Sequence, residues 1–146
     1  MSRESKLASI LRYLVYAVAL VPLIIFSQFI SPFHFGKVVV FRSLVEIMLV
    51  FYLLLIWRDR SYVVRWSKVT WAFFAFVVVF TFTTFTSINV YQSFWGTLER
   101  MGGLWTFWHY FIYFIILTSI IRTKDNWFKL FKLMIVVGIL SALYGF

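Results

Sequence analysis

Apolar residues follow one another along most of this chain, and polar residues gather in short clusters between them. Five apolar segments result, covering residues 11–30, 38–57, 69–88, 104–121 and 127–146. Each approaches the roughly 20 residues that a helix needs to cross the hydrocarbon core of a bilayer. Pro22 lies inside the first segment and is expected to kink its helix. The pattern predicts an all-α fold, a polytopic bundle of about five transmembrane helices.

The composition agrees with a membrane protein. Hydrophobic residues make up 63% of the 146 residues and charged residues 13%, whereas a soluble domain is roughly half apolar and about a quarter charged. The net charge of +9 comes from side chains near the ends of the apolar segments. There, Lys and Arg set the topology and contact anionic lipid. Because no basic stripe lies on a polar surface, we expect the lipid bilayer and not nucleic acid as a partner.

The positions of Lys and Arg predict the orientation of the bundle. With a cytoplasmic N-terminus, most of these residues fall on the cytoplasmic side, as the positive-inside rule requires. The cytoplasmic set is Arg3, Lys6, Arg12, Arg58, Arg60, Arg65, Lys68, Arg122, Lys124, Lys129 and Lys132, and the outer set is Lys37, Arg42 and Arg100. The last apolar segment has no polar flank at its end. We therefore expect the chain to be the N-terminal part of a longer protein.

The most unusual charged residues are Arg42 and Glu46 in the second segment. Glu46 lies about 12 Å below the outer surface if the helix begins near residue 38. An acidic side chain at that depth costs about 2.5–3.5 kcal/mol. Because residues four apart share a helix face, the two side chains are expected to pair. Such a pair either orients the helix within the bundle or forms a polar face that lines a substrate cavity.

Two further cations lie near the outer ends of the segments. Lys37 follows Gly36 where the second segment begins, so it either snorkels to the interface or meets an anionic head group together with Arg42. Arg100 lies beside Glu99 in the stretch "GTLERMGG", whose glycines predict a turn. His109 follows within the fourth segment and suits a hydrogen-bonded structural role better than acid–base chemistry.

The sequence offers little of the chemistry that enzymes ordinarily use. It has no cysteine, and its two histidines lie on different segments. We find no nucleophile triad, no paired carboxylates and no metal-ligand spacing. No metal or other cofactor is therefore expected. If the protein is an enzyme, this portion contributes charge stabilisation and the remaining chemistry lies elsewhere.

The stretch "SFWGTLERMGGLWTFWHYFIYFIIL" resembles the outer-loop signature of O-antigen ligase-like and O-antigen polymerase-like membrane proteins. In that superfamily a Ser-x-x-Gly, an Arg and a Gly that opens the next span recur between the third and fourth helices. The stretch "FGKVVVFRSLVE" is similar to the second helix of the family, and the resemblance covers residues 31–146. The matching loop positions here are Ser93, Gly96, Arg100 and Gly103.

The resemblance implies a glycosyltransferase of the bacterial inner membrane. Such proteins ligate or polymerise glycans from an undecaprenyl-pyrophosphate carrier on the outer face, without a metal. It also implies a main domain beyond residue 146, which carries the essential Arg and His on a large outer loop, so that this portion alone is inactive. The candidate carrier contacts are Arg100, Arg42 and Lys37, supported by Glu46, Glu99 and His109.

Two other functions are compatible with the same sequence. One is a portion of a transporter or channel, with Arg42 and Glu46 on its polar path. The other is a small membrane subunit without enzymatic activity.

Overall fold

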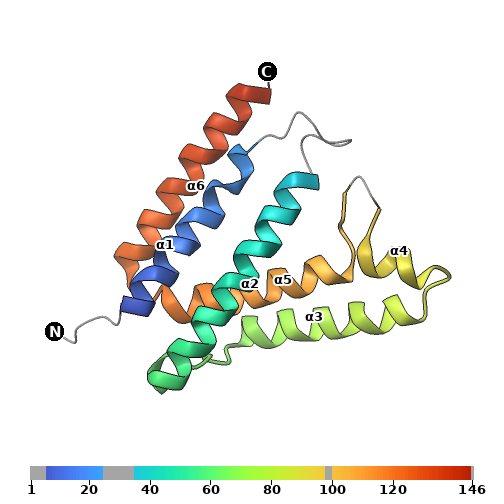
Figure 1. Ribbon diagram of the computed structural model, residues 1–146, viewed down its shortest axis with the longest axis horizontal. Helices are drawn as coiled ribbons and strands as arrows, with labels where there is room; N and C mark the ends of the chain where they lie inside the picture. Colours follow the sequence, from blue (N-terminus) through green and yellow to red (C-terminus); the bar gives the residue numbers. More distant parts are fainter. Residues whose placement is uncertain (1–5, 25–34, 98–99, 146) are drawn as a thin grey trace.

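The computed structural model describes residues 6–24, 35–97 and 100–145, and every regular element in this part of the chain is a helix (Figure 1). The prediction of an all-α membrane fold is confirmed. Four helical stretches are long and apolar enough to cross a membrane, and α5 is a shorter apolar helix. The elements are α1 (Lys6–Leu20), the 3₁₀ turn η1 (Val21–Leu23), α2 (Phe35–Arg58), the 3₁₀ turn η2 (Arg60–Tyr62), α3 (Lys68–Phe85), α4 (Val90–Trp95), α5 (Leu104–Ile120) and α6 (Lys124–Gly145).

The first segment differs from its prediction. Helix α1 begins at Lys6 and ends at Leu20, and Pro22 lies in the 3₁₀ turn that follows. Proline cannot donate a hydrogen bond to the preceding turn, so the α-helix ends before Pro22 instead of kinking around it. The expected continuation over residues 25–30 lies outside the described residues. The other four segments match α2, α3, α5 and α6 to within three residues at each described end, and the short α4 was not expected.

The helices pack in the order α6, α1, α2, α5 and α3. In Figure 1, α1, α2 and α6 run alongside one another, while α3 and α5 lie together across them. The central hydrophobic cluster comes from α1, α2, α5 and α6, with Leu11, Met48, Leu55 and Ile116 among its fully buried members. Helix α2 therefore joins the two groups, because it packs against α1 on one side and against α5 on the other.

Phenylalanines join α3 to α5. The ring of Phe73 lies 5.4 Å from the rings of both Phe111 and Phe114, and Phe80 lies 4.7 Å from Phe107. Edge-on and tilted aromatic pairs at these distances stabilise packing beyond their buried area. Near the end of α3, threonine hydroxyls bond to the backbone of their own helix. The hydroxyl of Thr84, for example, donates to the carbonyl of Phe80 at 2.8 Å.

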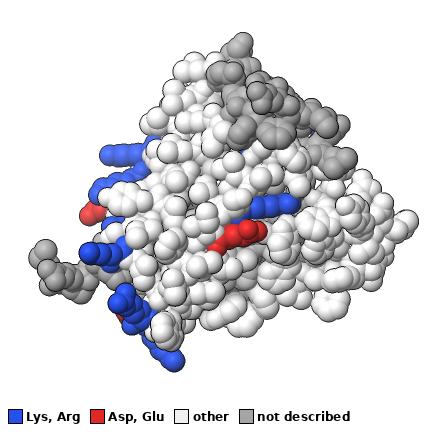
Figure 2. Space-filling model, viewed as in Figure 1, with Lys and Arg blue, Asp and Glu red and all other residues white. Residues whose placement is uncertain are grey.

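The end predicted to be cytoplasmic has its own polar contacts. Lys and Arg gather there in Figure 2, beside the starts of α1 and α6 and the end of α2. Arg122 donates to the carbonyl of Ser61 at 2.6 Å, and its guanidinium lies 4.7 Å from the ring centre of Tyr62. This cation–π contact and hydrogen bond join the corner between α5 and α6 to η2.

Candidate functional site

Two glycines close the loop between α4 and α5. Gly96 has φ 83° and ψ −178°, a backbone conformation that is open almost only to glycine. A Cβ atom on Gly96 would lie 2.5 Å from the nitrogen of Gly102, and one on Gly103 would lie 2.4 Å from the nitrogen of Gly96. The two ends of the loop therefore cross in direct backbone contact. The predicted glycine turn is confirmed, and it depends on both Gly96 and Gly103.

The other positions of the motif are used differently. The hydroxyl of Ser93 lies 2.6 Å from that of Ser87, so it joins α4 to the end of α3. Arg100 is exposed, and its backbone N–H donates to the carbonyl of Thr97 at 3.2 Å. Glu99 lies outside the described residues. Arg100 is therefore a cation that the loop presents on its surface.

Arg42 reaches from α2 to the end of this loop. Its side chain is buried, and Nη2 donates to the carbonyl oxygen of Met101 at 2.9 Å and to Oγ1 of Thr106. The hydroxyl of Thr106 donates to the same carbonyl. Hydrogen bonds from a guanidinium are about twice as strong as bonds between neutral groups. A charge-assisted contact thus fastens the loop to α2.

Glu46 finds its partner on α5. Its Oε1 lies 3.2 Å from Nε2 of His109, which is buried, and Nδ1 of His109 lies 2.8 Å from the carbonyl oxygen of Trp105. The prediction that Arg42 and Glu46 form an ion pair with each other is therefore wrong, since each has a different partner. Their spacing does place both on one face of α2, but α5 packs on that face and offers each residue a partner. The two charges still interact at longer range.

A third polar contact joins α2 and α5 nearer their ends. Further along α2 than Arg42 and Glu46, the hydroxyl of Tyr52 lies 3.1 Å from Oγ of Ser119. The same hydroxyl donates to the carbonyl of Tyr62. The partners on α5 advance along the chain together with those on α2, so the two helices run in the same direction where they cross. Thr106 and Ser119 were not predicted, although Thr106 lies three residues before His109 and so shares its helix face.

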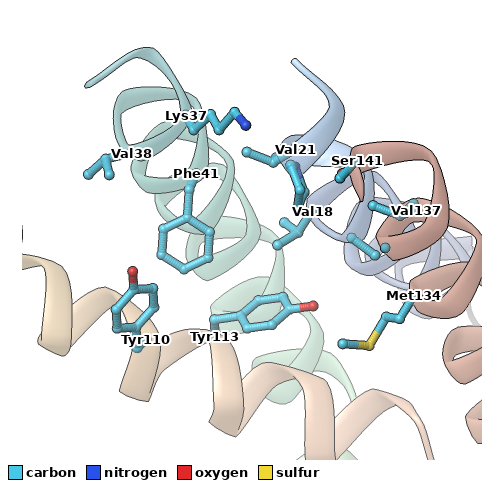
Figure 3. A pocket seen from close by; sticks show the side chains of 13 residues that line it. Val18, Val21, Lys37, Val38, Phe41, Tyr110, Tyr113, Met134, Val137 and Ser141 are labelled. Carbon is cyan, nitrogen blue, oxygen red and sulfur yellow. The ribbon is translucent and has the colours of Figure 1, made fainter. Parts of the chain in front are cut away.

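A cavity of about 540 Å³ lies on the other side of α2, between the end of α1, the start of α2, α5 and α6. Figure 3 shows Lys37 at one end of it, with the side chains of Phe41 and Tyr113 below. The lining is almost entirely apolar and includes Val18 from α1 and Val137 from α6. Lys37 thus lies next to an apolar space, whereas Arg42 belongs to the interface with α5.

The fold and these contacts define a helical membrane protein whose loop between α4 and α5 is fastened to α2 by a buried arginine. Within the described ranges, no group of three or more His, Asp or Glu side chains could hold a metal ion. Comparison with protein-family models, with curated proteins and with solved structures finds no match. The resemblance to O-antigen ligase-like proteins stays a prediction from the sequence.

Proposed function

We propose that this chain is the N-terminal membrane portion of a glycosyltransferase of cell-envelope biosynthesis. It would ligate or polymerise undecaprenyl-pyrophosphate-linked glycans, such as those of lipopolysaccharide, on the outer face of the bacterial inner membrane. The observation that carries the proposal is the apolar cavity with Lys37 at one end. A polyprenyl pyrophosphate has the complementary chemistry, because it joins an apolar chain to an anionic head group.

The size of the cavity suits part of such a lipid. Ligand pockets in proteins occupy about 300–1,000 Å³ and are lined mainly by apolar side chains. A cavity of about 540 Å³ can hold the first part of the polyprenyl chain, while the remainder stays in the bilayer. The ammonium of Lys37 then lies where a phosphate leaves the apolar space, and it donates charge-assisted hydrogen bonds to that phosphate.

The two arginines have separate roles in this proposal. Arg100 is exposed on the loop, so it is free to contact the pyrophosphate or the glycan. Arg42 is buried and donates to Met101 and Thr106, so it positions the loop that carries Arg100. Glu46 and His109 support this arrangement by joining α2 to α5 one turn further along.

The test is glycan transfer by the protein expressed from its intact gene. Arg100→Ala should reduce transfer from an undecaprenyl-pyrophosphate donor while leaving the amount of protein in the membrane unchanged. Lys129→Ala, an exposed cation at the start of α6, is the matched control and should leave transfer unchanged. Normal transfer by Arg100→Ala at normal expression would remove this residue from the site.

A second candidate function is a portion of a transporter. It is favoured by the row of buried polar contacts along α2 and α5, which runs from Arg42 and Thr106 past His109 to Ser119. Polar side chains inside membrane spans often mark solute or ion pathways. Reconstitution of the intact gene product separates the candidates, because solute flux without glycan transfer would support the transporter. If the protein showed neither solute flux nor glycan transfer, that result would support a non-enzymatic membrane subunit.

A further inference from the structure

Both ring nitrogens of His109 face oxygen atoms. Nδ1 lies 2.8 Å from the carbonyl oxygen of Trp105, and Nε2 lies 3.2 Å from Oε1 of Glu46. A carbonyl oxygen can only accept a hydrogen bond, so Nδ1 must carry a hydrogen. In a neutral imidazole with its hydrogen on Nδ1, Nε2 has a lone pair and no hydrogen. The contact with Glu46 therefore needs one additional proton, either on Nε2 or on the carboxyl group.

A proton on Nε2 lets the imidazole and the carboxylate meet as opposite charges, and such a hydrogen bond is stronger than one between neutral groups. Arg42 lies one helical turn from Glu46, and their charges also interact. The rings of Trp105 and His109 also pack edge to face, with their centres 5.0 Å apart and their planes at 69°. An imidazolium can donate from both nitrogens, and here each nitrogen has its acceptor.

We propose that His109 is a proton-binding site inside the membrane span. Uptake of one proton by its Nε2 produces an imidazolium held between the Glu46 carboxylate and the Trp105 carbonyl. The histidine–glutamate pair then changes from a net charge of −1 to zero. Without the proton, a lone pair would face a carboxylate, and the contact would repel α2 from α5. This inference concerns the interface between α2 and α5 and does not rest on the proposed glycan transfer.

Few ionisable groups surround the pair. On α3 the phenylalanines face α5, and the one charged residue of that helix is Lys68 at its start. The other charged or titratable side chains on the packed α-helices are Lys37, Arg42, Tyr52 and Arg58 on α2, Tyr110 and Tyr113 on α5, Tyr91 on α4, and Lys6, Arg12, Tyr13 and Tyr16 on α1. Of these groups, Arg42 is the cation that interacts with Glu46.

The two members of the pair differ in exposure. The side chain of Glu46 is 61% exposed, whereas that of His109 is 4% exposed. His109 is the buried member of the pair, and a charge on its ring would be costly in free energy without the carboxylate beside it.

Nitrogen NMR of the histidine ring tests the proposal directly. The protein would be labelled with ¹⁵N-histidine, carry His34→Gln so that His109 gives the only ring signals, and be reconstituted in lipid nanodiscs at neutral pH. We expect both ring nitrogens of His109 to carry hydrogen. In Glu46→Gln the amide N–H donates to Nε2, so the contact is kept and the extra proton is lost. That variant should therefore show hydrogen on Nδ1 alone.

Two results would overturn the proposal. One is a neutral ring in the protein with Glu46, giving the same spectrum as Glu46→Gln. The other is a hydrogen on Nε2 with none on Nδ1, which would contradict the bond to Trp105. Circular dichroism of both proteins checks that they are folded, and loss of the Nε2 hydrogen in Glu46→Gln alone supports the site.

Discussion

The guanidinium of Arg42 in α2 donates a hydrogen bond of 2.9 Å to the backbone carbonyl of Met101, which lies 59 positions further along the chain. Met101 lies within the glycine-closed loop and has a positive φ of 46°. A non-glycine residue rarely adopts such a conformation unless its surroundings hold it there. The buried arginine thus stabilises the backbone from which Arg100 projects, and it links α2 to the loop between α4 and α5.

Replacing Arg42 should loosen this loop. Arg42→Met removes the donor and leaves Thr106 bonded to Met101, so we expect a loss of about 1–2 kcal/mol in the free energy of unfolding. Hydrogen–deuterium exchange should become faster at the start of α5 and stay unchanged in α6. Arg58→Met, at the exposed end of α2, is the control. Unchanged exchange in Arg42→Met would show that the loop does not depend on this contact.

The two crossing glycines should tolerate no side chain. Gly96→Ala places a Cβ atom 2.5 Å from backbone and forces an unfavourable φ, and Gly103→Ala places one 2.4 Å from backbone. The backbone strain at Gly96 alone costs about 1–3 kcal/mol, and at Gly103 the clash with backbone atoms is the whole effect. Both variants should therefore unfold at clearly lower temperature. Gly102→Ala, in the same loop, meets nothing within 4 Å and should unfold like the unaltered protein. Equal unfolding temperatures for all three variants would refute the crossing.

The helices were predictable from sequence because a bilayer demands long apolar segments, and the glycine turn was predictable because its residues have special backbone freedom. The partners of Arg42 and Glu46 were not predictable in the same way. Spacing along α2 identifies the face that they share, but their partners depend on α5 running in the same direction as α2 where the two helices cross. The end of α1 was also missed, because proline in an apolar segment permits either a kink or a termination, and here the helix stops at Leu20.

The hydroxyl of Tyr52 should contribute to stability at the other end of the interface between α2 and α5. It bonds with Ser119 and with the carbonyl of Tyr62, both at 3.1 Å, and the residue is 4% exposed. Tyr52→Phe should therefore lower the free energy of unfolding by about 1 kcal/mol, measured by unfolding in mixed detergent and SDS. Tyr13→Phe, at a side chain that is 74% exposed, should have no measurable effect. An equal effect of the two substitutions would argue against the buried bonds.

The turn after α2 should depend on pH through Asp59. The backbone N–H of Ser61 donates to Oδ1 of Asp59 at 2.9 Å and holds the pKa of Asp59 below its ordinary value of 3.8. Because the folded pKa is lowered, the carboxylate stabilises the turn above pH 3.8 and loses this effect as pH falls through the folded pKa. Asp59→Ala should be less stable than the unaltered protein at neutral pH, and the difference should shrink in acid. A difference that grows in acid would contradict this assignment.

In the proposed function, the cavity beside Lys37 receives the chain of a polyprenyl pyrophosphate, and lipid binding to the purified protein is the closest test of this. Native mass spectrometry would compare undecaprenyl pyrophosphate with phosphatidylglycerol, an anionic lipid of the ordinary bilayer. Gly138→Leu fills the cavity from α6, where a Cβ atom meets nothing within 4 Å, and Lys37→Ala removes the cation. Lys129→Ala is the control.

We predict that the unaltered protein prefers undecaprenyl pyrophosphate. Both cavity variants should weaken this binding about tenfold, which corresponds to about 1.4 kcal/mol, and Lys129→Ala should not change it. Equal binding of the two lipids, or unchanged binding of undecaprenyl pyrophosphate by Gly138→Leu, would contradict the claim.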